Sequence, residues 1–157
     1  MSKKIAERYI GIDYGAARIG LAYSDERAVI ATTLALLKAE RGVKATVASL
    51  LKMMEQHTAQ LGYRIKAFVV GYPLMMSGKV GFIADEVDAF IAELEAQSQL
   101  PIVKLDERLS SLQADRALRE FGLSRKRRSK HLDTVSAVII LQSYLDQQKL
   151  AASDGAD

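Results

Sequence analysis

Three acidic residues stand at places where a charge needs a structural or chemical reason. The first, Asp13, ends the apolar stretch YIGID at residues 9–13. Aspartate is depleted inside strands, and a buried carboxylate without a partner is costly. Asp13 fits three roles: a metal ligand, part of a phosphate-binding loop, or a turn residue that hydrogen-bonds the backbone near Gly15, which is the ordinary interpretation. Which role Asp13 has depends on the other two acids and their surroundings.

The second acidic position lies in the segment LDER at residues 105–108, directly after the short apolar run IVKL. Neighbouring side chains of an extended chain point in opposite directions, so one of Asp106 and Glu107 is expected to face a site. A solvated acidic pair with Arg108 as its surface partner is the ordinary alternative.

The third acid, Asp133, begins an apolar helical pattern. Asp133, Ala137, Ile140 and Tyr144 follow the spacing i, i+4, i+7, i+11, which places Asp133 at the end of an otherwise apolar helix face. A carboxylate in the first turn also complements the helix dipole, which is a purely structural explanation. A core-facing carboxylate nevertheless needs a partner, and a metal ion is one.

Together, Asp13, Glu107 and Asp133 describe a cluster of metal-binding and catalytic carboxylates, provided that the first and fifth strands lie near each other. Hard oxygen ligands select Mg²⁺ or Mn²⁺. Two such ions about 3.5–4 Å apart stabilise both the attacking and the leaving oxygen in a phosphodiester displacement. The chain has two histidines and no cysteine, so the chemistry predicted here rests on acids.

A basic segment precedes Asp133. Between residues 104 and 131 the chain has nine Lys and Arg against four Asp and Glu. We expect a basic loop that holds a nucleic-acid backbone over the carboxylates, with a solvated loop as the alternative. His131, two residues before Asp133, is a minor candidate for a phosphate contact. The expected phosphate-binding side chains of the segment are Arg125, Lys126, Arg127, Arg128 and Lys130.

The elements that must position these residues are predicted by hydrophobic periodicity. Their order, three strands followed by alternating helices and strands, predicts an α/β fold with a mixed five-stranded sheet flanked by helices. We expect the functional residues to gather at the strand ends and nearby loops. The predicted strands are 8–14, 18–24, 29–37, 66–71 and 102–105, and the predicted helices are about 43–61, 83–94, 111–122 and 132–147.

Length and composition bound the remaining possibilities. The 157 residues predict one domain over 1–157, with flexible ends at about 1–7 and 149–157. No apolar run approaches the ~18 residues that span a bilayer, so no membrane partner is expected. The absence of cysteine excludes disulfides and fits a cytoplasmic location.

Four segments, in order and at suitable spacing, resemble the YqgF/RuvX family over nearly the whole chain. They are GIDYGAARIGLAYSD, VVGYPLMMSGKVG, LDERLSS and LDTVSAVIILQSYL. The resemblance implies a ribonuclease H-like fold and a nuclease that processes the 5′ end of precursor 16S ribosomal RNA, a family earlier described as Holliday junction resolvases.

The resemblance carries the family's acids onto Asp13, Glu107 (with Asp106 as the fallback) and Asp133. It also implies that Arg18 and Arg108 support the site or bind phosphate. The chain departs from the family pattern at 75–77, where Met-Met-Ser stands in place of an Asn-Met-Asp-like stretch. Substrate contacts made by that loop are therefore expected to differ.

Three other functions compete with a ribosomal RNA nuclease. The same chemistry on branched DNA gives a junction resolvase, which requires a dimer. A non-catalytic RNA-binding protein of ribosome assembly needs the basic segment but no acidic cluster. A nucleotide-binding module is suggested by GIDYGAARIG, but 157 residues do not supply the two lobes of such proteins. The expected partners are structured RNA, branched DNA or ribosomal precursor particles, with the protein a monomer or homodimer.

Overall fold

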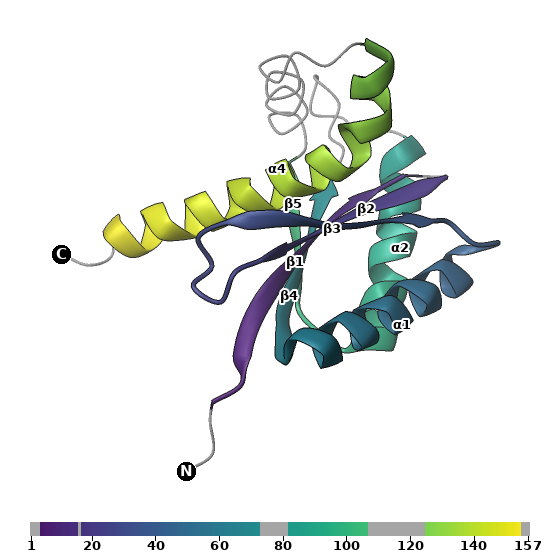
Figure 1. Cartoon of the computed structure of the whole chain (residues 1–157). Helices are drawn as coiled ribbons and strands as arrows, with labels where there is room; N and C mark the ends of the chain where they lie inside the picture. The colour runs from purple at the N-terminus through teal and green to yellow at the C-terminus, as the bar shows by residue number, and fades with distance from the viewer. Residues whose placement is uncertain (1–3, 16, 73–81, 107–124, 155–157) are drawn as a thin grey trace.

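The computed structural model describes residues 4–15, 17–72, 82–106 and 125–154 (Figure 1). Within the helices, the side chains of 82–84, 125–134 and 153–154 fall outside the description. The elements are β1 (Ala6–Tyr14), β2 (Arg18–Ser24), β3 (Ala31–Lys38), α1 (Val43–Leu61), β4 (Tyr63–Tyr72), α2 (Phe82–Ser98), β5 (Ile102–Asp106) and α4 (Arg125–Asp154).

These strands form one mixed sheet in the order β3-β2-β1-β4-β5. The first three strands pair antiparallel, while β4 is parallel to both β1 and β5. The long connections through α1 and α2 explain the parallel pairs, because a parallel neighbour needs a crossover. β4 therefore lies between β1 and β5, and the carboxyl ends of these three strands share one edge of the sheet.

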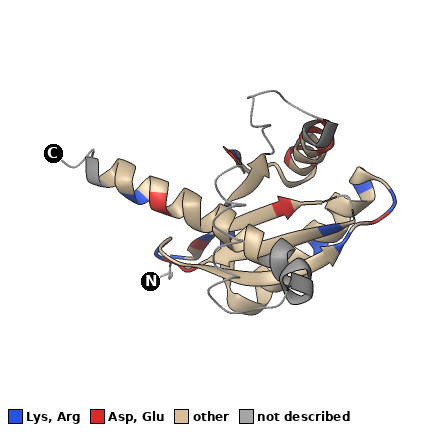
Figure 2. Ribbon diagram, turned by 90° about the horizontal axis from the view of Figure 1, so that it is seen from above, with Lys and Arg blue, Asp and Glu red and all other residues tan. Residues whose placement is uncertain are grey.

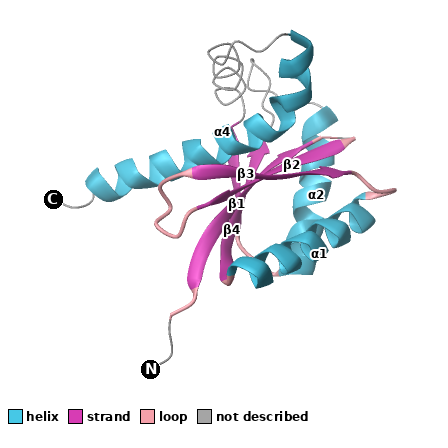
Figure 3. Ribbon diagram, in the orientation of Figure 1, coloured by secondary structure: helices cyan, strands magenta, loops and turns pink. Residues whose placement is uncertain are grey.

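Helices cover both faces of the sheet (Figure 3). α1 and α2 lie on one face, and α4 runs across the other. The α1 helix matches its predicted bounds, because apolar residues at helical spacing bury its inner side and Gly62 ends it in the left-handed conformation with φ of 73°. Between α1/α2 and the sheet lies a core of large side chains that includes Leu50, Phe68 and Phe90.

The last helix differs from its prediction. Residues 125–130 were expected to be a basic loop, but they form the first turns of α4, which then continues past the predicted end at Gln147 to Asp154. Lysine and arginine are strong helix formers, and no Gly or Pro interrupts residues 125–154. The charge run therefore extends the helix. The predicted helix at 111–122 lies outside the described residues.

The third strand begins later than predicted, at Ala31 instead of residue 29. The Asp25 carboxylate accepts hydrogen bonds from the backbone N–H of Val29 at 2.7 Å and of Ile30 at 3.0 Å. These bonds hold residues 29 and 30 in the turn, because aspartate competes with strand pairing for nearby backbone donors. Regular structure also reaches into both expected flexible ends, since β1 begins at Ala6 and α4 includes residues 149–154.

Candidate active site at the carboxyl ends of the strands

Asp13 lies at the carboxyl end of β1, on the face that α4 covers. Ile10 and Ile12 are fully buried in the core under α1 and α2. Because side chains of a strand alternate between its faces, the odd-numbered residues from 9 to 13 face the other way. Tyr9 confirms the direction, since its ring meets the Tyr144 ring of α4 edge to face with centroids 5.2 Å apart. Asp13 continues this face and is partly buried.

Glycines flank Asp13 on both neighbouring strands. Gly20 of β2 is its direct antiparallel partner. On the other side Ile12 pairs with Val70, so Gly71 of β4 stands at the level of Asp13. Gly71 is two residues after Val69, which packs under α4, so both residues belong to the same face of β4. The positions directly beside Asp13 on the two neighbouring strands are therefore both glycines.

A close approach between β1 and α4 fixes the helix over this face. A Cβ atom at Gly11 would lie 2.6 Å from the Cβ of Leu141 and 2.9 Å from the carbonyl oxygen of Ala137. Only glycine fits at such a distance, so Gly11 sets the separation of helix and strand. Along β1 from Tyr9 to Gly11 the contacts on α4 move from Tyr144 to Ala137, toward the start of the helix.

Asp133 belongs to the next turn of α4 in that direction. Four residues before Ala137 advance the helix by about 6 Å, and the two residues from Gly11 to Asp13 advance the strand by about 6.8 Å. The backbone of Asp133 is helical, whereas its side chain lies outside the described residues. The two advances are similar, as the predicted placement of Asp133 near Asp13 requires.

The alternation of β5 separates Asp106 from Asp13. Leu105 packs in the cluster under α4, while Lys104 forms an ion pair with Asp88 of α2 at 3.3 Å. Asp106 has the same parity as Lys104 and therefore belongs to the α2 face, opposite Asp13. Glu107 lies outside the described residues. The pairing of Leu105 with Gly71 places the end of β5 at the level of Asp13, one strand away across β4.

Of the basic side chains predicted to bind phosphate, the structure describes only that of Arg18. Arg18 is exposed at the start of β2 and shares the face of Gly20 and Ala22, so it stands diagonally from Asp13. Gly15 permits this tight hairpin, because a Cβ there would lie 2.6 Å from the Arg18 carbonyl oxygen. Arg108 lies outside the described residues. The side chains of Arg125, Lys126, Arg127, Arg128 and Lys130 do too, although their backbone forms the start of α4.

A polar network that the sequence did not reveal occupies the other face at the same edge. The Tyr72 hydroxyl donates to Asp88 at 3.0 Å, and the Lys104 ammonium lies 4.9 Å from the Tyr72 ring centroid. The hydrogen bond to Asp88, followed by burial, raises the pKa of Tyr72. Nothing in the spacing of these residues could have indicated the contact, which depends on α2 packing over β4 and β5.

Within the strands, Lys, Arg, Asp and Glu stand mainly toward the ends, so the middle of the sheet has few of them (Figure 2). Within the described ranges, no three His, Cys, Asp or Glu side chains come together as a metal site. Two of the three predicted metal ligands, Glu107 and the Asp133 side chain, lie outside the described residues. No helix among the described residues has the length and apolar character needed to cross a membrane.

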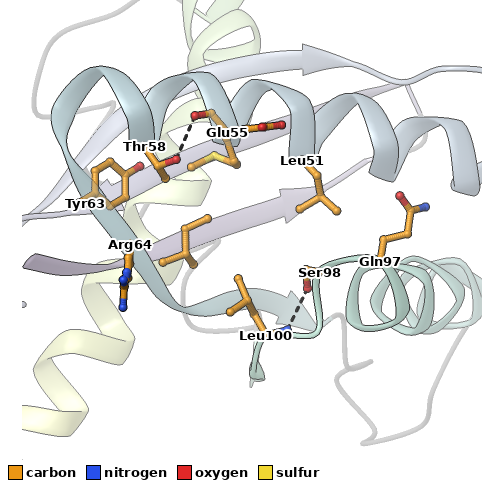
Figure 4. Close-up of a pocket in the computed structure, with 10 residues that line it drawn as sticks. Leu51, Glu55, Thr58, Tyr63, Arg64, Gln97, Ser98 and Leu100 are labelled. Atoms are coloured by element: carbon orange, nitrogen blue, oxygen red, sulfur yellow. Dashed lines mark hydrogen bonds between the residues drawn. The ribbon is translucent and has the colours of Figure 1, made fainter. Parts of the chain in front are cut away.

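A groove of about 460 Å³ lies at the opposite end of the sheet (Figure 4). It opens between α1, α2 and the start of β4, where Tyr63 pairs with Ala6 at the amino end of β1. One carboxylate, Glu55, lines it. The groove is therefore separate from the acidic edge, and its chemistry differs from that expected of a carboxylate site. It is lined by Leu51, Met54, Glu55, Thr58, Tyr63, Arg64, Ile65, Gln97, Ser98 and Leu100.

Comparison with known sequences gives one consistent family. The RuvX family model, described as a Holliday junction resolvase, matches residues 7–147. A Protochlamydia amoebophila protein named "Putative pre-16S rRNA nuclease" is 48% identical over 147 residues, which cover 94% of this chain and 98% of that protein. A Ruminiclostridium cellulolyticum protein of the same name is 36% identical over 140 residues, covering 89% and 94%.

Solved structures share the fold. RuvC of T. thermophilus in complex with a Holliday junction substrate has a TM-score of 0.53 at 16% identity, covering 90% of this chain and 96% of that one. The fowlpox virus Holliday junction resolvase has a TM-score of 0.52 at 13% identity, covering 89% and 99%. These likenesses confirm the expected ribonuclease H-like fold with its mixed five-stranded sheet.

Proposed function

We propose, because the chain belongs to the RuvX family, that it is a nuclease that processes the 5′ end of precursor 16S ribosomal RNA with a carboxylate-held Mg²⁺ or Mn²⁺. Nuclease activity is common to the family description and to the names of the curated relatives. Those relatives align over nearly their whole length, so the likeness concerns entire proteins.

The observation that carries the proposal is the position of Asp13 between Gly20 and Gly71 on the face covered by α4. The small neighbours on both sides would accommodate a cation and further oxygen ligands beside this partly buried carboxylate. We assign those ligands to Glu107 and Asp133. The alternation of β5 favours Glu107 over Asp106, because Glu107 is two residues beyond Leu105 and would share its face if the chain stayed extended.

The donor set fits a hard divalent cation, since all three proposed ligands are carboxylates. Such an ion, when bound, lowers the pKa of water and stabilises charge on a phosphodiester. The chain's own residues would position the substrate. Arg18 stands diagonally from Asp13, and we assign it with Arg108 and the basic first turns of α4 to the phosphates that flank the cut.

A pair of neighbouring variants tests this assignment. Glu107→Gln should lower cleavage of a precursor 16S RNA fragment at least about 100-fold, because metal ligands matter at least as much as their outer-shell partners. Asp106→Asn removes an equal charge one residue away, on the opposite face, and should retain activity within about threefold.

Asp13→Asn should lose activity as Glu107→Gln does. Cleavage by Asp13→Asn at the wild-type rate would exclude the carboxylate mechanism. Equal losses in Asp106→Asn and Glu107→Gln would show instead that the charge of the segment, and not a ligand at one position, matters.

A resolvase acting on branched DNA is the second candidate, favoured by the description of the matching family. Two symmetric cuts require two copies of the site, so this function predicts a homodimer that cuts a synthetic four-way DNA junction. Cleavage of the precursor RNA by a monomer that leaves the junction intact would exclude it. A non-catalytic RNA-binding role predicts binding without cleavage and no effect of Asp13→Asn.

A further inference from the structure

Arg18 and Lys38 stand directly opposite each other on β2 and β3. Both side chains are exposed. Directly opposed residues of an antiparallel pair share a face, and their Cβ atoms lie about 4.5–5.5 Å apart. Arg18 is on the face of Gly20, the partner of Asp13, so Lys38 belongs to that face too.

This pairing carries an energetic cost without an anion. Like charges directly across an antiparallel pair are destabilising. In the described parts of the chain, ion pairs join Arg8 to Glu26 and Lys104 to Asp88, and neither includes Arg18 or Lys38. A lysine on the edge strand β3 has an ordinary use in preventing edge-to-edge association. That use does not explain why an arginine is opposite it on an inner strand.

The backbone that carries the two cations is firmly held. The N–H of Ala39 donates to the carbonyl oxygen of Ala17 at 2.9 Å, which joins the residues that flank the pair. The turn that follows is closed by Thr46, whose hydroxyl oxygen accepts from the Glu40 N–H at 3.0 Å and donates to the Gly42 carbonyl oxygen at 2.9 Å. The cations therefore start from fixed positions, while their exposed side chains can reach a ligand.

We propose that Arg18 and Lys38 together bind one backbone phosphate of the nucleic acid, next to the phosphate that is cut. The pair would extend the substrate path from the site at Asp13 across β2 to the edge strand β3. The assignment of Lys38 rests on the proposed function, since it takes the ligand to be a nucleic-acid strand.

Binding without cleavage tests the proposal. Anisotropy of a fluorescein-labelled precursor 16S RNA stem, without divalent ions, gives the affinity over a range of salt concentrations. One phosphate contact changes the slope of log affinity against log salt by about 0.7–0.9, which is about threefold in affinity between 50 and 200 mM salt. Lys38→Gln should lower the slope by this amount, and Lys38→Arg should restore it.

Lys52→Gln is the matched control, because Lys52 is an exposed lysine of α1 on the other side of the sheet. Its slope should equal that of the wild type. If both side chains are needed to hold one phosphate, the double variant Arg18→Gln/Lys38→Gln should lose no more slope than Arg18→Gln or Lys38→Gln alone. A loss equal to the sum of the two single losses would overturn the shared phosphate. Equal slopes for Lys38→Gln and Lys52→Gln would overturn the assignment. A wild-type protein without salt-dependent binding would instead overturn the proposed function itself.

Discussion

The two faces of the sheet are built from different side chains. The face under α1 and α2 is filled by large residues, among them Leu50, Phe68 and Phe90, which are fully buried. The face under α4 has glycine or alanine where the strands approach the helix, as at Gly11 and Ala22. Large side chains stabilise the fold through buried area. Small ones permit a close approach of α4 to the sheet.

We infer that the α1/α2 face contributes most of the stability, and that the α4 face mainly positions the site residues. A substitution under α1 and α2 should therefore change the free energy of unfolding more than the activity of the folded molecules. A substitution under α4 near Asp13 should do the reverse. Five substitutions test this division, beginning with the one that should have the largest effect on stability.

Phe90→Ala should be the most destabilising of the five. Phe90 is fully buried in α2 and stacks on Tyr14, with ring centroids 4.6 Å apart. Removing a buried Phe side chain costs about 3–5 kcal/mol. Urea unfolding measures the loss, and cleavage assayed well below the unfolding midpoint should stay within about threefold of wild type. An activity loss as large as that of Glu107→Gln would show that this face also positions the site.

Gly11→Ala should cost less stability but much more activity. The added Cβ would meet the Ala137 carbonyl oxygen and the Leu141 Cβ, so α4 must move away from β1. Overpacking of this kind costs about 1–3 kcal/mol. We expect cleavage to fall at least about tenfold, because the helix that carries Asp133 is displaced.

Gly62→Ala is the matched control for that variant. Gly62 is constrained by its backbone, with φ of 73°, and no atom lies within 4 Å of an added Cβ. An alanine there costs about 1–2 kcal/mol and should leave activity unchanged. Equal activity in Gly11→Ala and Gly62→Ala would refute the positioning role of Gly11.

The pH dependence of stability should come in part from the α1/α2 face, through His57 and Tyr63, whose Nδ1 and hydroxyl oxygen lie 2.6 Å apart. Burial, followed by the nearby Arg8 charge, lowers the pKa of His57 below its ordinary 6.5. The unfolded chain therefore binds the proton more readily, and the free energy of unfolding falls as the pH drops below about 6.5.

At the alkaline end, burial raises the pKa of Tyr63 to about 12. The stability gained from its protonated hydroxyl is complete below pH 10 and is lost as the pH rises from about 10 to 12. Urea titrations across these ranges measure both effects, and His57→Gln should flatten the acidic part. An unaltered acidic slope in that variant would assign the effect to other groups.

Lys104→Gln should have the smallest effect. Its ion pair with Asp88 joins side chains that are 52% and 44% exposed. Such surface pairs contribute about 0–1 kcal/mol. The loss should shrink further in high salt. A larger effect would indicate that the network of Tyr72, Asp88 and Lys104 supports the site from the second face.

Much of the fold could be predicted from local pattern. The helical spacing and terminal glycine of α1 are local, as is the continuous apolar run at the centre of β4, and both predictions were confirmed. The start of α4 was wrong because the charge of residues 125–130 was taken to indicate a loop, although their helix propensity is high.

The site could be predicted only in part, because its geometry depends on pairing. Asp13 stood out as an acid at the end of an apolar strand. Its flanking glycines and the opposite face of Asp106 follow from the sheet order and register, which a sequence does not display. The pairing of Lys38 with Arg18 also depends on the register of two strands. The role of Glu107 and of the Asp133 side chain stays a prediction.

The most direct test of the carboxylate site is a crystal of the wild-type protein soaked in Mn²⁺ and measured for anomalous scattering. The carboxylate site requires a peak on the α4 face beside Asp13, within about 2.0–2.2 Å of carboxylate oxygens of Asp13, Glu107 and Asp133. No peak should appear in Asp13→Asn. Manganese bound elsewhere, with none beside Asp13 in crystals of protein that cleaves the RNA, would contradict it.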